Sequence, residues 1–484
     1  MSNPSNKYAK KVMDIFADIC RIPRPSGREE QIGKYLMDFA ASRGLSATMD
    51  ATGNVVIRKP AAAGCGKRQT VILQAHQDMV CEKDATLEHD FLTQPIETYV
   101  EDGWLKARGT TLGADDGMGI AMALAVLDSD DIKHGPVECL FTVSEETGLT
   151  GAENLQPGMM NGSMLINLDS EDEGEIFIGC AGGINTRISF DYKPEEIPAG
   201  YFFMRISIDK LHGGHSGDDI DKGYANANKL LARFLCQSMD RYDLKLCSIS
   251  GGNLSNAIPR DATALIAIPQ ACKESLRVDF NVFVSQIENE FHATEKQAVF
   301  IMESADATGT CIETAIAKNI INALTAVTNG VFAMSMDVKG LVETSSNLAR
   351  IRTEDGKVNI VTSQRSSVES AKYAVQQALS ACFRLAGGKV ESNDGYPGWT
   401  PNPDSRLLDI SVRTYRELFG KEPKVKAIHA GLECGLFLKS YPGLDMISVG
   451  PTLRGVHSPS ERLELATVPM VFDHLVAILE NIPE

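Results

Sequence analysis

Short apolar runs alternate with amphipathic helical stretches between residues 7 and 185, and this alternation limits the chain to few folds. The runs are NVVIRK, TVILQAH, VECLFTVSE and SMLINLD, and turns rich in Gly, Asp and Pro separate them. Strands that alternate with helices predict an α/β fold with a mainly parallel central sheet that helices flank. The apolar stretch at 112–129, LGADDGMGIAMALAVLDS, follows a turn and predicts a helix packed on that sheet.

The middle of the chain has a different pattern. With 484 residues the chain is too long for one ordinary core, and two domains are the most economical division. The middle reads as α+β, with strand-like runs such as YFFMRISID, and its two successive strand-and-helix sets suggest an internal duplication. We therefore expect residues 1–186 and 391–484 to form one α/β domain, interrupted by an inserted α+β domain at 187–390.

Charge and cysteine usage narrow the class of function. Lys and Arg number 47 against 64 Asp and Glu, and the net charge of −17 disfavours nucleic acids and anionic membranes as partners. No apolar run approaches the roughly 20 residues of a membrane span, and the N-terminal stretch lacks the features of a signal peptide. Eleven scattered cysteines without a C-x-x-C pair are typical of a reducing compartment. We expect a cytoplasmic protein without a nucleic-acid or membrane partner.

Acidic side chains and one histidine gather where the apolar runs end and where the helix at 112–129 begins. They are His76, Asp78, Asp115, Asp116, Glu145, Glu146 and Asp169. At the carboxyl edge of a parallel sheet they would lie where α/β proteins bind ligands. Few basic residues stand beside them in the sequence, so the carboxylates would repel one another unless cations neutralise them. Solvated acidic turns are the alternative for any single cluster, but several clusters in series favour a metal site.

Two local patterns refine this hypothesis. Neighbouring side chains of a strand point to opposite faces, so the adjacent Glu145 and Glu146 are either both solvated or have separate roles. His76 and Asp78 share a face, which would let Asp78 orient His76 toward a metal; a hydrogen-bonded histidine at a sheet edge is the alternative. His457 lies in a Gly- and Pro-rich loop, GPTLRGVHSPSE, which is typical of site residues more than of core residues.

The order of these motifs resembles that of the di-zinc exopeptidases that include carboxypeptidase G, aminoacylase and carnosinase, and most closely the aminoacyl-histidine dipeptidases. The matching stretches extend over essentially the full length: ILQAHQDMV, TLGADDGMGIAMALAVL, SEETGLTGA, LINLDSEDEGEIFIGCAGG, GGHSGDDI, NAIPR, HAGLECGLF and GPTLRGVHSPSE. The resemblance implies a zinc-exopeptidase-like catalytic domain, a lid formed by 187–390, and hydrolysis of Xaa-His and related small dipeptides, β-Ala-His included. The alternatives are a related amidohydrolase, such as an aminoacylase, tripeptidase or carboxypeptidase, and a silent peptide- or metal-binding member.

The resemblance also implies a ligand set for two divalent ions. The ligands would be His76, Asp115, Glu146, Asp169 and His457. One ion would be held by His76 and Asp169 and the other by Glu146 and His457, with Asp115 as the bridge. Zinc is the expected metal, and cobalt or manganese also fit mixed nitrogen and oxygen ligands.

Two further residues would act in catalysis according to the resemblance. Asp78 would orient His76, and Glu145 would be the general base that takes a proton from a bridging water activated by both metals. Relatives commonly have a cis peptide bond after the bridging carboxylate, so we expect one between Asp115 and Asp116.

Substrate contacts are expected from His215, Asn256, Arg365 and Glu433. By resemblance, His215 would stabilise the oxyanion of the tetrahedral intermediate, and Asn256 and Arg365 would contact the C-terminal carboxylate of the substrate. Glu433 would bind the substrate amine. A simple turn histidine and a surface ion-pair partner are the alternatives for His215 and Arg365. The resemblance leaves both a monomer and a homodimer open.

Overall fold

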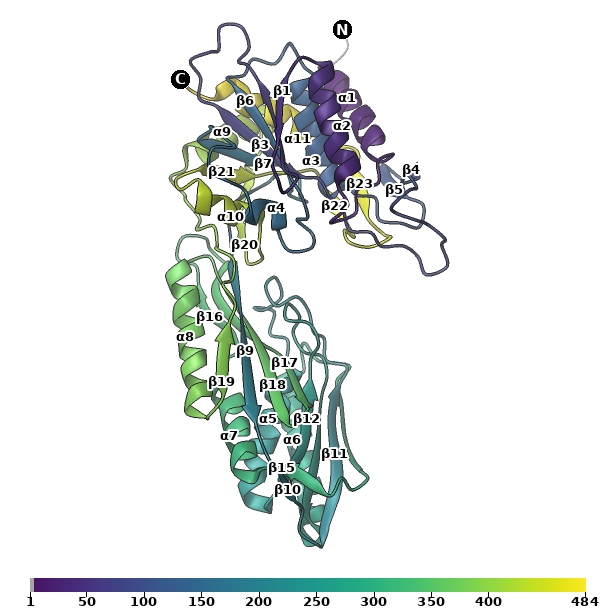
Figure 1. Ribbon diagram of the computed structural model, residues 1–484, viewed down its shortest axis with the longest axis vertical. Helices are drawn as coiled ribbons and strands as arrows, with labels where there is room; N and C mark the ends of the chain where they lie inside the picture. Colours follow the sequence, from purple (N-terminus) through teal and green to yellow (C-terminus); the bar gives the residue numbers. More distant parts are fainter. Residues whose placement is uncertain (1–3) are drawn as a thin grey trace. The chain divides into compact units, whose positions relative to one another are not determined.

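The computed structural model describes residues 4–484, which divide into two compact units (Figure 1). Unit 1 contains the described residues up to Cys180 together with Trp399–Ala427 and Leu432–Glu484. Unit 2 contains Ala181–Gly398 and the short return Ile428–Gly431. Unit 1 is therefore assembled from both ends of the chain, and unit 2 mainly from its middle.

An eight-stranded sheet forms the centre of unit 1, in the order β1-β2-β6-β3-β7-β21-β8-β20. Its strands are β1 (Ser46–Met49), β2 (Val55–Lys59), β3 (Val71–His76), β6 (Val137–Thr142), β7 (Met164–Asn167), β8 (Glu175–Cys180), β20 (Lys424–Ile428) and β21 (Asp445–Ser448). The four neighbours β6, β3, β7 and β21 run parallel. The pairs β1–β2, β2–β6 and β8–β21 are antiparallel. The predicted parallel sheet is confirmed for the centre of a mixed sheet.

Helices enclose this sheet in unit 1. They are α1 (Pro4–Ile19), α2 (Glu30–Ser42), α3 (Ala114–Leu127), α4 (Thr150–Glu153), α9 (Arg406–Phe419), α10 (Glu433–Ser440) and α11 (Thr467–Asn481). Helix α3 corresponds to the helix predicted at 112–129 and packs on β3 and β6 on one side and on α1 on the other. Because it is enclosed in this way, its residues are apolar on nearly every face.

A smaller antiparallel sheet in unit 1 has the order β22-β23-β5-β4. Its strands are β4 (Thr98–Glu101), β5 (Trp104–Ala107), β22 (Leu453–Arg454) and β23 (Arg462–Glu464). The chain between β22 and β23 is the Gly- and Pro-rich loop that contains His457. This sheet therefore brings the C-terminal part of the chain back to the first part.

Unit 2 is built on a nine-stranded sheet whose path is β14-β11-β13-β12-β17-β18-β9-β19, with β16 paired to β17. The strands are β9 (Gly182–Asp191), β11 (Tyr201–Asp209), β12 (Lys245–Gly251), β13 (Ala262–Pro269), β14 (Val299–Ser304), β16 (Gly330–Met334), β17 (Val342–Glu354), β18 (Lys357–Ser366) and β19 (Lys389–Ser392). A separate pair joins β10 (Pro194–Glu196) to β15 (Thr310–Ile312). Every pairing is antiparallel.

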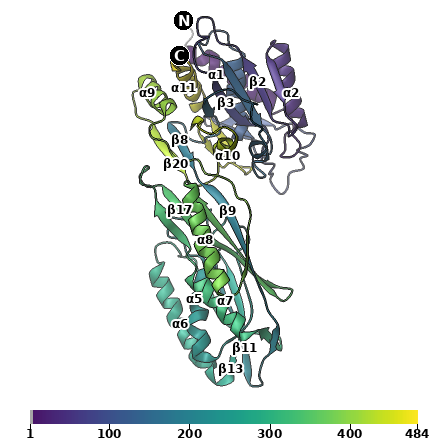
Figure 2. The same ribbon diagram turned by 60° about the vertical axis from the view of Figure 1, so that its left-hand side comes forward.

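The helices of unit 2 lie along its sheet (Figure 2). They are α5 (Ala227–Tyr242), α6 (Lys273–Glu290), α7 (Thr314–Ala326) and α8 (Glu369–Leu385), preceded at α6 by a short 3-10 turn, η1 (Gln270–Cys272). Their apolar faces and the sheet enclose a separate core. The α+β character of the inserted part is confirmed, and its internal duplication stays a prediction. None of the helices within 4–484 is both long and apolar enough to cross a bilayer.

Candidate metal centre

The carboxyl ends of three neighbouring strands of unit 1 carry most of the predicted ligands. His76 is the last residue of β3, Glu145 and Glu146 follow β6, and Asp169 follows β7. Since β6 and β7 both pair in parallel with β3, their carboxyl ends meet at one edge of the sheet. Helix α3 begins at the same edge and adds Asp115.

Asp115 lies between two histidines that come from distant parts of the chain. Its Oδ1 is 3.0 Å from Nε2 of His76, and its Oδ2 is 3.2 Å from Nε2 of His457. The two imidazoles therefore approach opposite oxygens of one carboxylate. This is the arrangement expected of a carboxylate that bridges two ions.

The remaining predicted ligands divide between the two histidines. Oδ1 of Asp169 is 3.5 Å from Nε2 of His76, and Oε2 of Glu146 is 3.0 Å from Nε2 of His457. Ligand atoms of Asp115, Glu146 and His457 all lie within 4.8 Å of one another. The five predicted ligands are therefore one cluster, with one histidine and one carboxylate on each side of Asp115.

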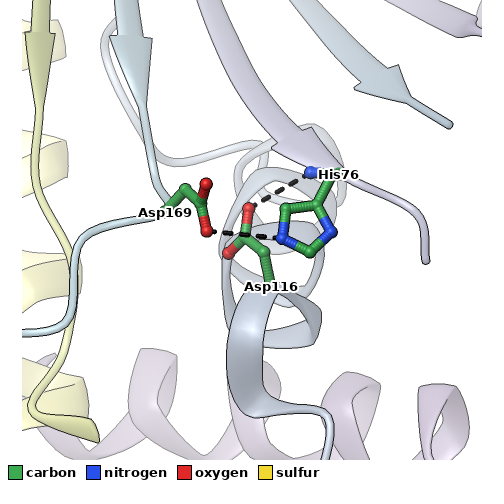
Figure 3. Close-up of side chains that lie close together, drawn as sticks. All are labelled: His76, Asp116 and Asp169. Atoms are coloured by element: carbon green, nitrogen blue, oxygen red, sulfur yellow. Dashed lines mark hydrogen bonds and ion pairs between the residues drawn. The ribbon is translucent and has the colours of Figure 1, made fainter. Parts of the chain in front are cut away.

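Asp116 points to the same cluster and was not among the predicted ligands. Figure 3 shows His76, Asp116 and Asp169 side by side, with the ring of His76 turned toward Asp169. Both carboxylate oxygens of Asp116 accept backbone N–H groups, Oδ2 from His76 over 3.2 Å and Oδ1 from Gly119 over 2.9 Å. Asp116 therefore joins the end of β3 to the first turn of α3. The peptide bond between Asp115 and Asp116 is cis, as predicted.

Asp78 is fully buried and holds several parts of the site together. Its Oδ1 lies 3.4 Å from Nδ1 of His76 and accepts the backbone N–H of Glu145 over 3.0 Å. Its Oδ2 accepts the N–H of Glu146 and the hydroxyl of Ser26. Burial alone would raise the pKa of Asp78, but the contacts with His76, Ser26 and Glu145 outweigh it and lower that pKa to about 2.

The two adjacent glutamates have different surroundings. The carboxylate of Glu146 contacts His457, whereas none of the hydrogen bonds among residues 4–484 ends on the carboxylate of Glu145. An oxygen of Glu145 still lies within 4.8 Å of ligand atoms of His76 and Glu146. Burial, with nearby carboxylates, raises the pKa of Glu145 well above its usual range. Glu146 therefore contacts a histidine, whereas the carboxylate of Glu145 can still form a hydrogen bond with water.

The charges of the cluster fit divalent cations. Burial raises the pKa of Asp169 well above its usual value. Hydrogen bonds to Asp115 and Glu146 raise the pKa of His457 to about 11. In the protein alone, protons would therefore have to offset much of the negative charge. Two imidazole nitrogens and three carboxylates form a mixed donor set that suits zinc, cobalt or manganese, so the residues present fit a pair of such ions.

The sequence reasoning missed a buried positive charge at this edge. Arg24 is 2% exposed, and its guanidinium donates to the carbonyl oxygens of Gln77, Asp78 and Gly113. Arg24 brings a positive charge to this edge from a distant part of the sequence, but its hydrogen bonds within residues 4–484 go to backbone carbonyl oxygens and not to the clustered carboxylates. Glu461, four residues after His457, was missed as well. In the sequence, only the neighbouring Pro- and Ser-rich turns distinguish Arg24 and Glu461 from other charged residues.

Unit 2 brings three predicted substrate contacts into one neighbourhood. The backbone of His215 pairs with Ala257, and the next N–H, that of Ser216, donates to the carbonyl oxygen of Asn256 over 2.8 Å. Nδ1 of His215 is 3.2 Å from Oδ2 of Asp218. Burial would raise the pKa of Asp218, but the hydrogen bond with His215 and the nearby Arg365 and His429 side chains lower it.

Arg365 lies at the end of β18 and is buried in unit 2. Its Nη1 donates to the hydroxyl of Tyr396 over 3.0 Å, and its Nε has no hydrogen-bond partner among the described residues. Asn256 is exposed. Arg365 therefore is not the surface ion-pair partner that was the alternative reading.

Glu433, the fourth predicted substrate contact, lies in unit 1 at the start of α10. Its Oε2 accepts hydrogen bonds from Nε2 of Gln74 over 2.6 Å and from the hydroxyl of Thr142 over 2.8 Å. Its Oε1 is buried without a hydrogen-bond partner among the described residues. Burial raises the pKa of Glu433 to about 7. Because Gln74 and Thr142 lie on β3 and β6, this carboxyl group is held beside the strands that carry His76 and Glu145.

Comparison with known proteins gives matches over nearly the whole chain. The profile described as "Peptidase family M20/M25/M40" matches residues 72–481. The cytosol non-specific dipeptidase of Escherichia coli (strain K12) is 42% identical over 483 residues, which cover 100% of both chains. The crystal structure of aminoacylhistidine dipeptidase from Vibrio alginolyticus superposes with a TM-score of 0.92 at 43% identity, covering 98% of this chain and 97% of that one. An aminopeptidase structure from Bacillus cereus, with a TM-score of 0.58 at 17% identity and 98% and 99% coverage, shares the fold.

Proposed function

Because the chain belongs to peptidase family M20/M25/M40, we propose that it is a metal-dependent dipeptidase that hydrolyses Xaa-His and related dipeptides, β-Ala-His included. The observation that carries this proposal is the carboxylate of Asp115, which His76 and His457 approach from opposite sides. The names of the two similar proteins, a non-specific dipeptidase and an aminoacylhistidine dipeptidase, support the substrate class. They also support a cytoplasmic location, since the first is named a cytosol enzyme.

In this proposal the five clustered side chains hold two divalent ions, with zinc as the native metal. His76 and Asp169 would hold one ion, Glu146 and His457 would hold the other, and Asp115 would serve both. The division of the carboxylates between the two histidines supports this assignment. When bound, such ions supply Lewis acidity, which polarises a peptide carbonyl and acidifies water.

Glu145 is the proposed general base. It takes a proton from the attacking water and delivers it to the nitrogen of the leaving amine, so that the same carboxylate serves both halves of the reaction. No hydrogen bond within residues 4–484 ends on its carboxylate, which supports this role, because a base must keep its lone pairs free for the proton. Asp78 orients His76 and fixes the backbone of Glu145, so it acts through both of them.

The inserted residues 187–390 are proposed to act as a lid for the catalytic part, residues 1–186 and 391–484. His215 would stabilise the developing oxyanion, and Asn256 with Arg365 would bind the C-terminal carboxylate of the dipeptide. The unpartnered Nε of Arg365 supports that assignment, since a guanidinium offers several donors to a carboxylate. Glu433, with Oε1 unpartnered, would accept a hydrogen bond from the substrate amine.

Metal analysis combined with a dipeptide panel tests this function. Purified protein should contain two divalent ions per chain and cleave β-Ala-His, several Xaa-His dipeptides and some dipeptides without His. A chelator should abolish cleavage, and zinc, cobalt or manganese should restore it to different extents. Protein that is loaded with metal and binds dipeptides without cleaving them would instead be a silent member. Preferential cleavage of N-acyl amino acids or tripeptides would point to a related amidohydrolase.

A further inference from the structure

The loop that carries Asp115 is held by a single distant carboxylate. Four successive backbone N–H groups, from Leu112 to Asp115, point to Glu461. Oε2 accepts from Leu112 over 2.7 Å and from Gly113 over 2.9 Å. Oε1 accepts from Ala114 over 2.8 Å and from Asp115 over 3.3 Å. Glu461 is 2% exposed, so these bonds form away from water, where an unpaired N–H would be costly.

Glu461 also takes the place of a local cap for α3. The residue before the helix is Gly113, which has no side chain to accept the free N–H groups of the first turn. A carboxylate at a helix N-terminus is further favoured by the helix dipole. The side chain that completes α3 therefore comes from the loop of His457, four residues away from it in sequence.

The opposite side of the same loop is held by a buried cation. The guanidinium of Arg24 donates to the carbonyl oxygen of Gly113 through Nη2 and to those of Gln77 and Asp78 through Nη1. Gly113 has a φ of +70°, and a Cβ there would lie 2.7 Å from Nη2 of Arg24. A glycine is therefore required for this close approach. Arg24 ties the Asp115 loop to the end of β3, which carries His76.

We propose that Glu461 and Arg24 are positioning residues that fix the Asp115 loop relative to His457 and His76 before any metal binds. Glu461 joins the loop to the segment of His457, and Arg24 joins it to the segment of His76. A ligand cluster whose geometry is fixed in advance loses less conformational freedom on binding an ion. This inference rests on the two-metal function proposed above and adds the residues that set the affinity of that site.

Glu138 offers a matched control in the same unit. It is also buried and accepts backbone N–H groups from another loop, those of Asn161 over 2.7 Å and Gly162 over 3.0 Å. Its hydrogen bonds within the described part of the chain go to Arg58, Asn161 and Gly162, and to none of the proposed ligands. Glu138→Gln should therefore weaken the fold to a similar extent as Glu461→Gln without touching the metal cluster.

The test compares metal binding in Glu461→Gln, Glu138→Gln and the wild-type protein. A glutamine keeps the shape of Glu461 but turns an NH2 group toward backbone N–H donors, so the loop loses part of its support. Zinc affinity is measured by competition with a chromophoric chelator, and geometry by the visible absorption spectrum of the cobalt-loaded protein. We expect Glu461→Gln to bind zinc roughly 10- to 100-fold more weakly, the range found for groups that orient metal ligands. Its cobalt spectrum should change, and kcat for β-Ala-His should fall more than KM changes. Glu138→Gln should match the wild-type protein in zinc affinity, in its cobalt spectrum and in its kinetic constants.

Arg24→Lys provides an independent variant, because a single ammonium group keeps the charge but cannot reach the three carbonyl oxygens together. Arg24→Lys should also weaken zinc binding. If Glu461→Gln does not fold, the zinc affinity of Arg24→Lys tests the positioning role instead. Wild-type affinity and an unchanged cobalt spectrum in the folded variants would overturn the inference, and so would an equal loss in Glu138→Gln. A wild-type protein that binds no metal would instead refute the proposed function itself.

Discussion

Oδ1 of Asp78 accepts a hydrogen bond from the backbone N–H of Glu145 over 3.0 Å. Asp78 follows β3 and Glu145 follows β6, so this bond joins the ends of two neighbouring parallel strands. The same carboxylate lies against the ring of His76. One buried side chain therefore sets the distance between a proposed metal ligand and the proposed general base, which ties metal binding to proton transfer.

Asp78→Asn should lower metal affinity and turnover together. An asparagine has only one accepting oxygen, so its NH2 group would face either the Glu145 N–H and the ring of His76 or the Glu146 N–H and the hydroxyl of Ser26. The expected loss of metal affinity is roughly 10- to 100-fold, measured by chelator competition. Asp445→Asn is the control, because Asp445 also accepts a backbone N–H, that of Leu407, but at the amino end of β21. Equal metal loss in both variants would contradict the role given to Asp78.

Replacing each adjacent glutamate by glutamine should separate catalysis from metal binding. Glu145→Gln removes only the proposed base, so kcat should fall by about 10²- to 10⁴-fold with the metal content intact. Glu146→Gln removes a charged partner of His457 and should lose metal. Metal content by elemental analysis and kcat for β-Ala-His are measured on both. Equal metal loss in the two variants would contradict the assignment.

Arg365→Lys should weaken recognition of the substrate carboxylate. A lysine keeps the charge but loses the planar set of donors. A hydrogen bond to a charged group contributes roughly 1.5–3 kcal/mol, so KM for dipeptides should rise by about tenfold or more. The wild-type protein should cleave dipeptides with a free C-terminal carboxylate faster than the corresponding C-terminal amides. In Arg365→Lys this difference in rate should be smaller. Arg352→Lys is the control, because Arg352 lies on the neighbouring strand β17, toward the end of that strand remote from Arg365. Unchanged discrimination in Arg365→Lys would exclude this contact.

Acid should destabilise the protein partly through His474. Burial lowers the pKa of His474 to about 4, against about 6.5 in an unfolded chain. As the pH falls below 6.5, the unfolded chain takes up a proton that the folded chain refuses until about pH 4. The free energy of unfolding should therefore decrease over that window, by at most about 1.4 kcal/mol per pH unit for this group.

His474→Gln tests this contribution. Nε2 of His474 donates to the carbonyl oxygen of Ser411 over 2.9 Å, and a glutamine amide can do the same without titrating. The melting temperature of the variant should depend less on pH between 6.5 and 4 than that of wild type, as measured by calorimetry. Parallel pH curves for the two proteins would show that His474 does not carry this dependence.

Most of the proposed ligands could be picked out in the sequence because they stand where a strongly patterned element begins or ends, whereas their roles as ligands came from the family resemblance. His76 ends a fully buried strand, and Asp115 opens a helix that is apolar on nearly every face. The antiparallel flanks of the sheet were not predicted, since a short buried strand has the same pattern whichever way its neighbour runs. Arg24 and Glu461 were missed because their partners are backbone groups, which have no signature in the sequence.

The sequence by itself determined which elements form and which chemical groups stand at their ends, since hydrophobic periodicity and turn residues act over a few neighbouring positions. Only the tertiary structure decided that His457 meets Asp115 across 342 residues and that Glu461 meets Leu112 across 349. It also decided that Asp115 faces two histidines while Asp116 binds backbone N–H groups. Such pairings depend on strand order and on which buried donors lack a local partner, and both are set only when distant segments pack together.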